Sequence, residues 1–194
     1  MSSSKRASML PPPPKPPTSF STNITIADHA LLYGTYLITI RGHTVLHPRA
    51  RLNSSFAPIT IGTQCVIGER STIGMSNFPS EEQVQGVVLE NGVIIETGAV
   101  VEAKLVGQGS LIEIKAKVGR GAVIGKVHIS HFHCKIGSMC EVAEDEIIPD
   151  YTVIYGNGLR RIDKSGVEAL KMKMIGRHVD VLRKLLPSNL SKYQ

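Results

Sequence analysis

The sequence contains no tryptophan, and aromatic residues make up only 5% of its 194 positions. Its core must therefore come from aliphatic side chains, which suits thin, regular β layers better than an ordinary globular core. No run approaches the roughly 18 apolar residues that span a membrane. No apolar stretch follows Lys5 and Arg6, as a signal peptide would require. We therefore expect neither membrane insertion nor a secretory signal.

Cysteine is scarce as well, and the body of the chain has no excess of positive charge. Three cysteines, an odd number, favour the reducing cytoplasm over a disulfide-bonded secreted protein. The net charge of +6 comes from the ends, because residues 21–158 hold ten basic and thirteen acidic residues. A basic face with interleaved aromatics, the usual sign of nucleic-acid binding, is missing. We expect no nucleic-acid partner.

What the sequence has instead is an aliphatic residue at every sixth position. The longest unbroken series of such steps runs from Val106 to Ile154, with Ser130 as its one exception. A period of six is a multiple of the strand period of two, so all these side chains face the same way. The positions are Ile26, Leu32, Ile40, Leu46, Leu52, Ile61, Ile67, Ile73, Leu89, Ile95, Val101, Val106, Ile112, Val118, Ile124, Ser130, Ile136, Val142, Ile148 and Ile154.

Two further positions of the six-residue unit follow a pattern. The second is often glycine, as at Gly62 and Gly68, and we expect these glycines to adopt the positive φ angles of sharp corners. The fifth is usually small and includes Cys65, Cys134 and Cys140, which we interpret as apolar filler rather than nucleophiles. Three units make one triangular coil. The pattern predicts an all-β fold, a single-stranded parallel β-helix of six to seven coils, and resembles the left-handed β-helix family.

The rest of the chain divides around this body. Residues 1–20 are proline-rich and are expected to form a disordered tail, residues 21–160 the β-helix, and residues 161–194 a C-terminal helix and tail. Apolar residues at helical spacing between 165 and 186, followed by a proline, predict the helix. It is expected to cover the side or an end of the β-helix, where strand edges would otherwise be open.

Two interruptions of the period predict loops. The nine residues from Leu52 to Ile61 leave a small insertion, and the sixteen residues from Ile73 to Leu89 leave a protruding loop around 77–86. Loops on a rigid scaffold often carry binding function, although a tolerated surface insertion is the equal alternative. Phe78 and Pro79 of the longer loop, FPSEEQVQ at 78–85, are candidate partner-binding residues.

Histidines are the residues that would make such a fold catalytic. His128 and His133 have the five-residue spacing of the γ-class carbonic anhydrases, but no histidine lies between His47 and His128 to supply a third zinc ligand. His43 or His47 is the available general base for a hexapeptide acyltransferase, but no carboxylate stands at an obvious register to orient it. We expect no catalytic residue, metal or cofactor. A homotrimeric enzyme of either class is the alternative.

Charged residues at the corners are further candidates for partner binding. Glu90, Glu96 and Glu102 occupy the second position of three successive units, with no basic residue among 81–103. They are expected at three different corners, so they form no catalytic pair. They form either a negative band for a basic partner or a solvated acidic surface.

Two arginines follow the last strand of the repeat. Arg160 and Arg161 lie where the repeat meets the predicted helix. They pair either with acidic groups of a partner or with the chain's own carboxylates, such as Glu144 and Asp145. The sequence leaves both possibilities open.

Three segments carry a resemblance to a known family. TVLHPRARL at 44–52, EIIPDYTVIYGNGLRRI at 146–162 and VDVLRKLLPSNLSKY at 179–193 resemble the early coils, closing motif and C-terminal helix of the dynactin subunit 6 family. The resemblance covers about residues 24–193. The proline-rich start and a diverged region at 103–135 depart from it.

The resemblance implies a non-catalytic scaffold subunit of the dynactin pointed-end complex, supporting cargo attachment of dynein–dynactin in microtubule-based transport. It implies as partners dynactin subunit 5, the pointed-end actin-related protein and other dynactin subunits, with cargo adaptors reached indirectly. The implied location is the cytoplasm, on the cytoskeleton.

Overall fold

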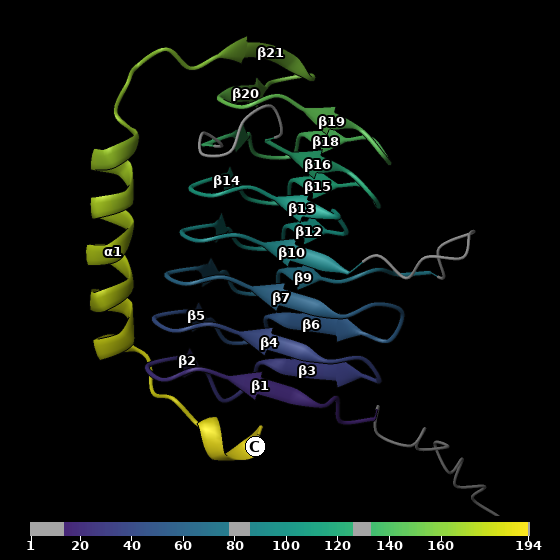
Figure 1. Cartoon of the computed structure of the whole chain (residues 1–194), viewed down its shortest axis with the longest axis vertical. Coiled ribbons are helices and arrows are strands. Elements are labelled where there is room, and N and C mark those ends of the chain that lie inside the picture. The colour runs from purple at the N-terminus through teal and green to yellow at the C-terminus, as the bar shows by residue number, and fades with distance from the viewer. Residues whose placement is uncertain (1–13, 78–85, 126–132, 194) are drawn as a thin grey trace, which may run out of the picture.

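The computed structural model describes residues 14–77, 86–125 and 133–193, which form a triangular coil of short strands with one long helix beside it (Figure 1). Three sheets make the sides of the triangle, and we call them faces 1, 2 and 3. Face 1 contains β1 (Thr18–Phe20), β4 (Ile38–Ile40), β7 (Ile59–Ile61), β10 (Val87–Leu89), β13 (Leu105–Val106), β16 (Val123–Ile124) and β19 (Ile147–Ile148). Face 2 contains β2 (Thr25–Ile26), β5 (Val45–Leu46), β8 (Val66–Ile67), β11 (Ile94–Ile95), β14 (Leu111–Ile112), β17 (Lys135–Ile136), β20 (Thr152–Tyr155) and β21 (Leu159–Ile162). Face 3 contains β3 (Leu31–Gly34), β6 (Arg51–Ser54), β9 (Thr72–Ile73), β12 (Val100–Val101), β15 (Lys117–Val118) and β18 (Glu141–Val142).

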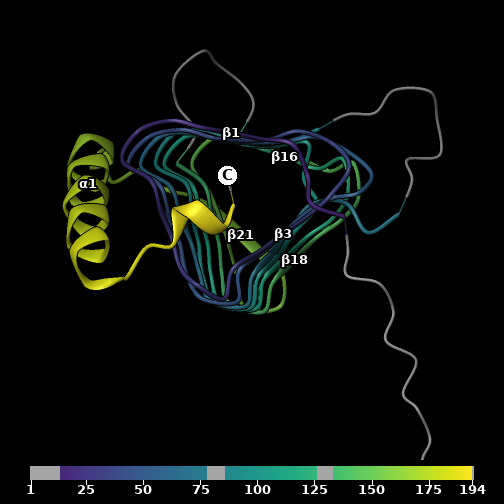
Figure 2. The same cartoon turned by 90° about the horizontal axis from the view of Figure 1, so that it is seen from below.

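Successive coils stack in parallel register, so that each aliphatic position lies above its counterpart one coil earlier. Ile40 pairs with Ile61, and Val106 pairs with Ile124. Seen from the end where the chain starts, the chain turns counterclockwise from face 1 through faces 2 and 3 as it recedes from the viewer (Figure 2). This is a left-handed coil, so the predicted fold class is confirmed.

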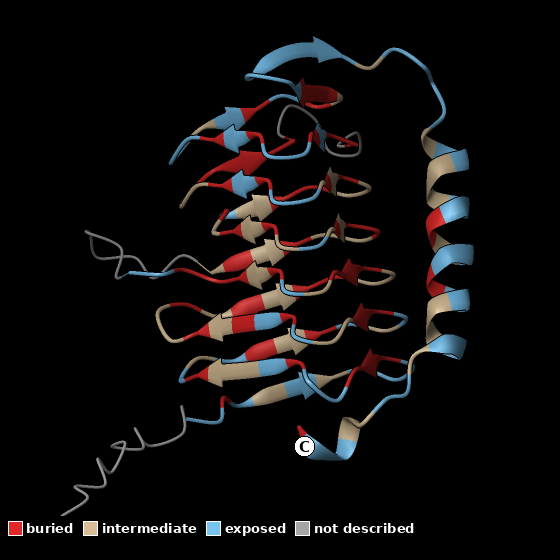
Figure 3. Ribbon diagram, turned by 180° about the vertical axis from the view of Figure 1, so that it is seen from behind, coloured by how far each residue is buried: buried red, intermediate tan, exposed pale blue. Residues whose placement is uncertain are grey.

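The predicted aliphatic positions form the core inside the triangle. Within the described residues every one of them is buried except Leu32, which is half-buried, and Ser130 lies outside the described residues. The small fifth positions are buried as well, including Cys65, Cys134 and Cys140. Figure 3 shows buried and exposed residues alternating along the coils, with the inward-facing positions of most strands buried. β-Branched residues fit this geometry because one side of each short strand is fully enclosed.

The predicted role of the second-position glycines is confirmed at Gly74 and Gly125, which have positive φ, but is wrong at most of the others. Gly62 and Gly68 do not have positive φ; a Cβ on either would lie 2.7 Å from backbone atoms of the next coil. Glycine is therefore needed there because stacked coils approach closely. The positive φ angles fall mainly on the fourth position, for example at Gln64 and Arg70.

The longest series of six-residue steps hides an insertion. Face 1 strand β16 is followed by face 2 strand β17, and Ile112 pairs with Ile136, 24 residues away rather than the 18 of a three-unit coil. The coil that joins Ile112 to Ile136 is therefore six residues longer than a three-unit coil. An insertion of one full period keeps the phase of the repeat, so counting by six could not detect it.

The predicted helix is present as α1 (Glu168–Leu185), which runs along face 2 back toward the start of the coil (Figure 1). Its buried residues Ile175 and Val179 pack against Val45 and Val66. The prediction that the helix covers the side of the β-helix is confirmed. Of the apolar residues that suggested the helix, Val167, Leu170, Met174, Val181 and Leu185 are exposed, and only Leu182 packs on face 2.

The end of the chain closes the opening of the first coil. After α1 the chain passes under β2, where the Asn189 amide donates to the Ile26 carbonyl, and enters the short 3-10 helix η1 (Leu190–Lys192). The Tyr193 side chain is buried beneath the core, and its hydroxyl lies 2.8 Å from the carbonyl oxygen of Ala30. Sequence reasoning assigned the tail no such role.

The first coil also begins earlier than the predicted boundary at residue 21. Strand β1 starts at Thr18 and pairs with β4, and the Gly34 amide donates to the Pro14 carbonyl. The predicted tail of 1–20 therefore includes residues of the β-helix. The short strand β1 follows directly after the prolines, and three residues are too few to show a strand pattern in the sequence. Residues 1–13 lie outside the described part.

Candidate interaction surfaces

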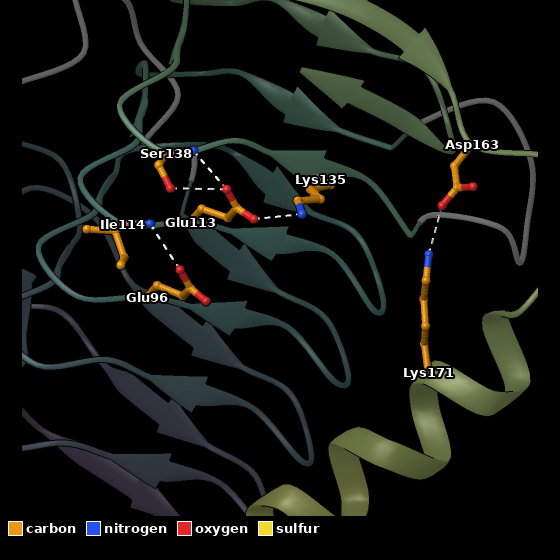
Figure 4. Close-up of polar contacts among 7 residues, drawn as sticks. All are labelled: Glu96, Glu113, Ile114, Lys135, Ser138, Asp163 and Lys171. Carbon is orange, nitrogen blue, oxygen red and sulfur yellow. Dashed lines mark hydrogen bonds and ion pairs between the residues drawn. The ribbon is translucent and has the colours of Figure 1, made fainter. Parts of the chain in front are cut away.

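Two of the three corner glutamates, Glu90 and Glu96, bind backbone amides of the neighbouring coil. Glu90, Glu96 and Glu102 follow β10, β11 and β12 and so lie at three different corners, as expected. A carboxylate oxygen of Glu90 accepts a hydrogen bond from the Gln108 amide at 3.1 Å, and one of Glu96 accepts from the Ile114 amide at 3.1 Å (Figure 4). Each carboxylate thus satisfies a turn donor that the sheets leave unpaired.

Glu113 repeats this arrangement one coil further on. Its carboxylate accepts from the amide and hydroxyl of Ser138 at 2.9 and 3.1 Å and forms an ion pair of 2.7 Å with Lys135 (Figure 4). Burial alone would raise the pKa of Glu113, but these hydrogen bonds outweigh it and lower the pKa. Glu90, Glu96 and Glu113 therefore join neighbouring coils, and this role was not predicted from their positions.

The two arginines lie on β21, an exposed strand that folds back antiparallel on β20. Arg160 forms an ion pair with Glu146, a carboxylate of the same chain. Glu144, which was expected as a possible partner, pairs instead with Arg120 at 2.9 Å. Arg161 is exposed, and no ion pair joins it to a described residue. Arg161 is thus the freer of the two for a partner.

The candidate loop residues Phe78 and Pro79 lie outside the described residues. The loop leaves the coil after β9, at Gly74, whose φ of +121° and close approach to the Asn53 carbonyl exclude a side chain. It returns at β10 on face 1.

The histidines that would support catalysis lie in structural contacts. His43 Nδ1 is 3.0 Å from a guanidinium nitrogen of Arg183 on α1, which donates to it. Burial lowers the pKa of His47, the nearby His178 lowers it further, and Glu69 acts in the opposite direction. His133 stacks on Tyr151 with 6.4 Å between ring centroids. Arg183 of α1 thus reaches His43, which stays exposed at its corner.

The described residues give little support for a metal site or for a reactive thiol. His128 lies outside them, and within them no group of three or more His, Cys, Asp or Glu side chains is placed to hold a metal ion. Burial raises the pKa of the Cys65 and Cys134 thiols to about 12, so both are protonated at neutral pH. They are filler, as expected.

The outer side of α1 is a surface that sequence reasoning did not single out. Leu170, Met174, Val181 and Leu185 are 53–72% exposed, while the opposite side of the helix packs on face 2 (Figure 3). The signal was present in the sequence as two apolar stripes on one helix. Only the structure separates the packed stripe from the exposed one.

The loop between β21 and α1 is fixed by an ion pair. Lys171 Nζ lies 2.9 Å from a carboxylate oxygen of Asp163, and this hydrogen bond, together with those from Ser165, holds the pKa of Asp163 at about 2 (Figure 4). The contact joins the first turns of α1 to the closing hairpin and so sets where the helix starts along face 2.

The fold and its corner contacts define a hexapeptide-repeat β-helix protein. A solved structure of a hexapeptide transferase family protein from Anaplasma phagocytophilum matches with a TM-score of 0.57 over 89% of this chain and 99% of that one. Its sequence is 11% identical, so the likeness concerns the fold alone. No protein-family model matches the sequence. No helix in the described residues is both long and apolar enough to cross a membrane.

Sequence relatives identify the family. Dynactin subunit 6 of Xenopus tropicalis, Nematostella vectensis and Danio rerio is 32%, 34% and 33% identical to this chain. The matches cover 78% of this chain and 73%, 79% and 75% of those proteins, respectively. The chain belongs to the dynactin subunit 6 family, as the resemblance of its motifs predicted.

Proposed function

We propose that this chain is a non-catalytic scaffold subunit of the dynactin pointed-end complex. It supports attachment of dynein–dynactin cargo in microtubule-based transport, in the cytoplasm on the cytoskeleton. The observation that carries the proposal is the identity of 32–34% to dynactin subunit 6 over about three quarters of those proteins.

The geometry supports a scaffold because it is rigid and regular. Stacked coils are joined by continuous parallel pairing and by corner carboxylates, and the C-terminal segment closes the opening of the first coil. Such a body offers flat sides and fixed corners to other regular surfaces. The partners we propose are dynactin subunit 5, the pointed-end actin-related protein and other dynactin subunits, with cargo adaptors reached indirectly.

Two corner residues, two residues of β21 and two residues outside the described ranges are the proposed contacts. Arg161 is exposed and offers an acidic partner a charge that no described residue pairs. Arg160 offers its charge only in competition with Glu146, and Glu90 and Glu96 use one oxygen on their own chain. Phe78 and Pro79 of the long loop complete the set. We propose no nucleic-acid partner and no membrane insertion.

Purification of the tagged full-length chain from cells tests the proposal. We expect the chain to co-sediment with the actin-like filament and the other dynactin subunits, and mass spectrometry to identify those proteins. Recovery as a free homotrimer with stoichiometric zinc or bound coenzyme A, and without dynactin subunits, would instead favour the enzyme alternative.

A further inference from the structure

The outer side of α1 has the spacing of a helix-pairing seam. Leu170, Met174, Arg177, Val181 and Leu185 follow one another at steps of four, three, four and four residues. Steps of three or four residues place side chains in one narrow stripe, the arrangement by which two helices interlock. The four apolar members of this stripe are 53–72% exposed, although α1 is already packed on its other side.

The charge beside the stripe is mostly positive, with Asp180 as the one acidic residue among three bases. Lys173 and Lys184 are exposed on one flank of the seam, and Arg177 is exposed within it. Among the described residues none of the three has an ion-pair partner, whereas Lys171 pairs with Asp163. Asp180 is exposed, pairs with Arg183, and lies three residues from Arg177 and four from Lys184. The outer side therefore offers apolar contact together with an excess of positive charge, three bases against the single carboxylate of Asp180.

We infer that this surface, which we call the α1 outer seam, binds an amphipathic helix with acidic flanking residues on a partner protein. Such a helix would bury the exposed apolar side chains and place carboxylates opposite the unpaired bases. The inference goes beyond the proposed function, because it concerns what this surface recognises and does not depend on which assembly contains the chain.

Two other occupants fit the surface less well. A second copy of the chain would bring the same bases against Lys173, Arg177 and Lys184, and like charges repel. An anionic membrane surface favours a wide apolar face with aromatic side chains. The seam instead is a narrow stripe, and it carries no aromatic residue.

The seam is tested by titrating the full-length chain into a labelled helical peptide of about three heptads, with leucine at the core positions and glutamate at the flanks. We expect saturable binding by fluorescence anisotropy that weakens as salt is added, because exposed charges are screened. The double variant Met174→Glu, Val181→Glu should bind at least about tenfold more weakly, since it places like charge on the seam.

A matched control variant separates the effect of added negative charge from the effect of its position on the seam. Leu159→Glu, Ile162→Glu adds the same charge at exposed apolar residues of β21, away from the seam, and should bind like the parent chain. Because all four residues are exposed, both double variants should keep the parent's circular dichroism melting curve. Gel filtration and vesicle sedimentation complete the comparison.

Several results would overturn the inference. If the parent and the Met174→Glu, Val181→Glu variant bind the peptide equally well, the seam is not the binding site. If a peptide with lysine in place of glutamate binds as tightly as the acidic peptide, the seam does not select an acidic partner. Self-association lost in the seam variant would assign the seam to a second copy, and binding to phosphatidylserine vesicles without binding to the acidic peptide would assign it to a membrane.

Discussion

Substitution of Tyr193 should loosen the closure of the first coil. The ring is buried beneath the core, and the hydroxyl lies 2.8 Å from the Ala30 carbonyl oxygen and 3.2 Å from that of Ala27. Tyr193→Phe removes one partly enclosed hydrogen bond and should lower the free energy of unfolding by about 1 kcal/mol. Tyr193→Ala also removes the ring, and loss of a buried aromatic side chain costs about 3–5 kcal/mol.

Thermal unfolding followed by circular dichroism measures both effects. For a chain of this size about 1 kcal/mol shifts the Tm by roughly 2–4 °C, so we expect a shift of a few degrees for Phe and roughly 6–12 °C or more for Ala. Tyr155→Phe is the control, because Tyr155 is 43% exposed on β20. If the Tm of Tyr193→Ala stays within about 1 °C of the parent, the C-terminal segment does not stabilise the coil and this reasoning is refuted.

Three further predictions concern the core, the N-terminus and the closing loop. Ile124→Ala should lower the free energy of unfolding by about 2–5 kcal/mol in urea titrations, because Ile124 is fully buried, and a soluble Ile124→Asp with unchanged melting would contradict the register. Deletion of residues 1–13 should leave the Tm unchanged, whereas deletion of residues 1–20 should lower it by removing β1; equal Tm values would contradict that difference. Because the pKa of Asp163 is lowered to about 2 from 3.8, its contribution is present at neutral pH and is lost as pH falls from about 4 to about 2. The Tm difference between the parent and Asp163→Asn should therefore shrink over that range, and a difference that stays constant would show that the ion pair contributes nothing.

The repeat made the fold readable from the sequence because each unit has the same environment. Ile61, Ile67 and Ile73 occupy equivalent places on three faces, so one rule assigns all of them. The same regularity hid the insertion after Ile124, since six extra residues leave the phase unchanged. A period reports which way side chains face, not how many sides a coil has.

The roles of the charged residues could not be read from the same rule. Glu90 and Glu96 were placed at the correct corners, but their hydrogen bonds join residues 18 apart that only the stacking of coils brings together. The apolar pattern of α1 located the helix, yet it did not distinguish Leu182, which packs on face 2, from Met174, which is exposed. That distinction depends on how the helix is rotated against face 2.

The α1 outer seam and the closing tail both lie in the C-terminal 36 residues, 159–194, which carry nine basic and three acidic residues. The body has the opposite balance. Exposed charges contribute little to the free energy of folding. An excess of basic residues on an outward-facing helix is therefore better explained by recognition of a partner than by stabilisation of the fold. This part of the chain is where we expect partners to be distinguished.

Light scattering on the chain co-expressed with dynactin subunit 5 tests the scaffold assignment most directly. The proposed function predicts a stable one-to-one complex, eluting as a single species whose mass is the sum of subunit 5 and the 21.0 kDa of this chain. A tight homotrimer of three 21.0 kDa chains that leaves subunit 5 unbound would contradict it.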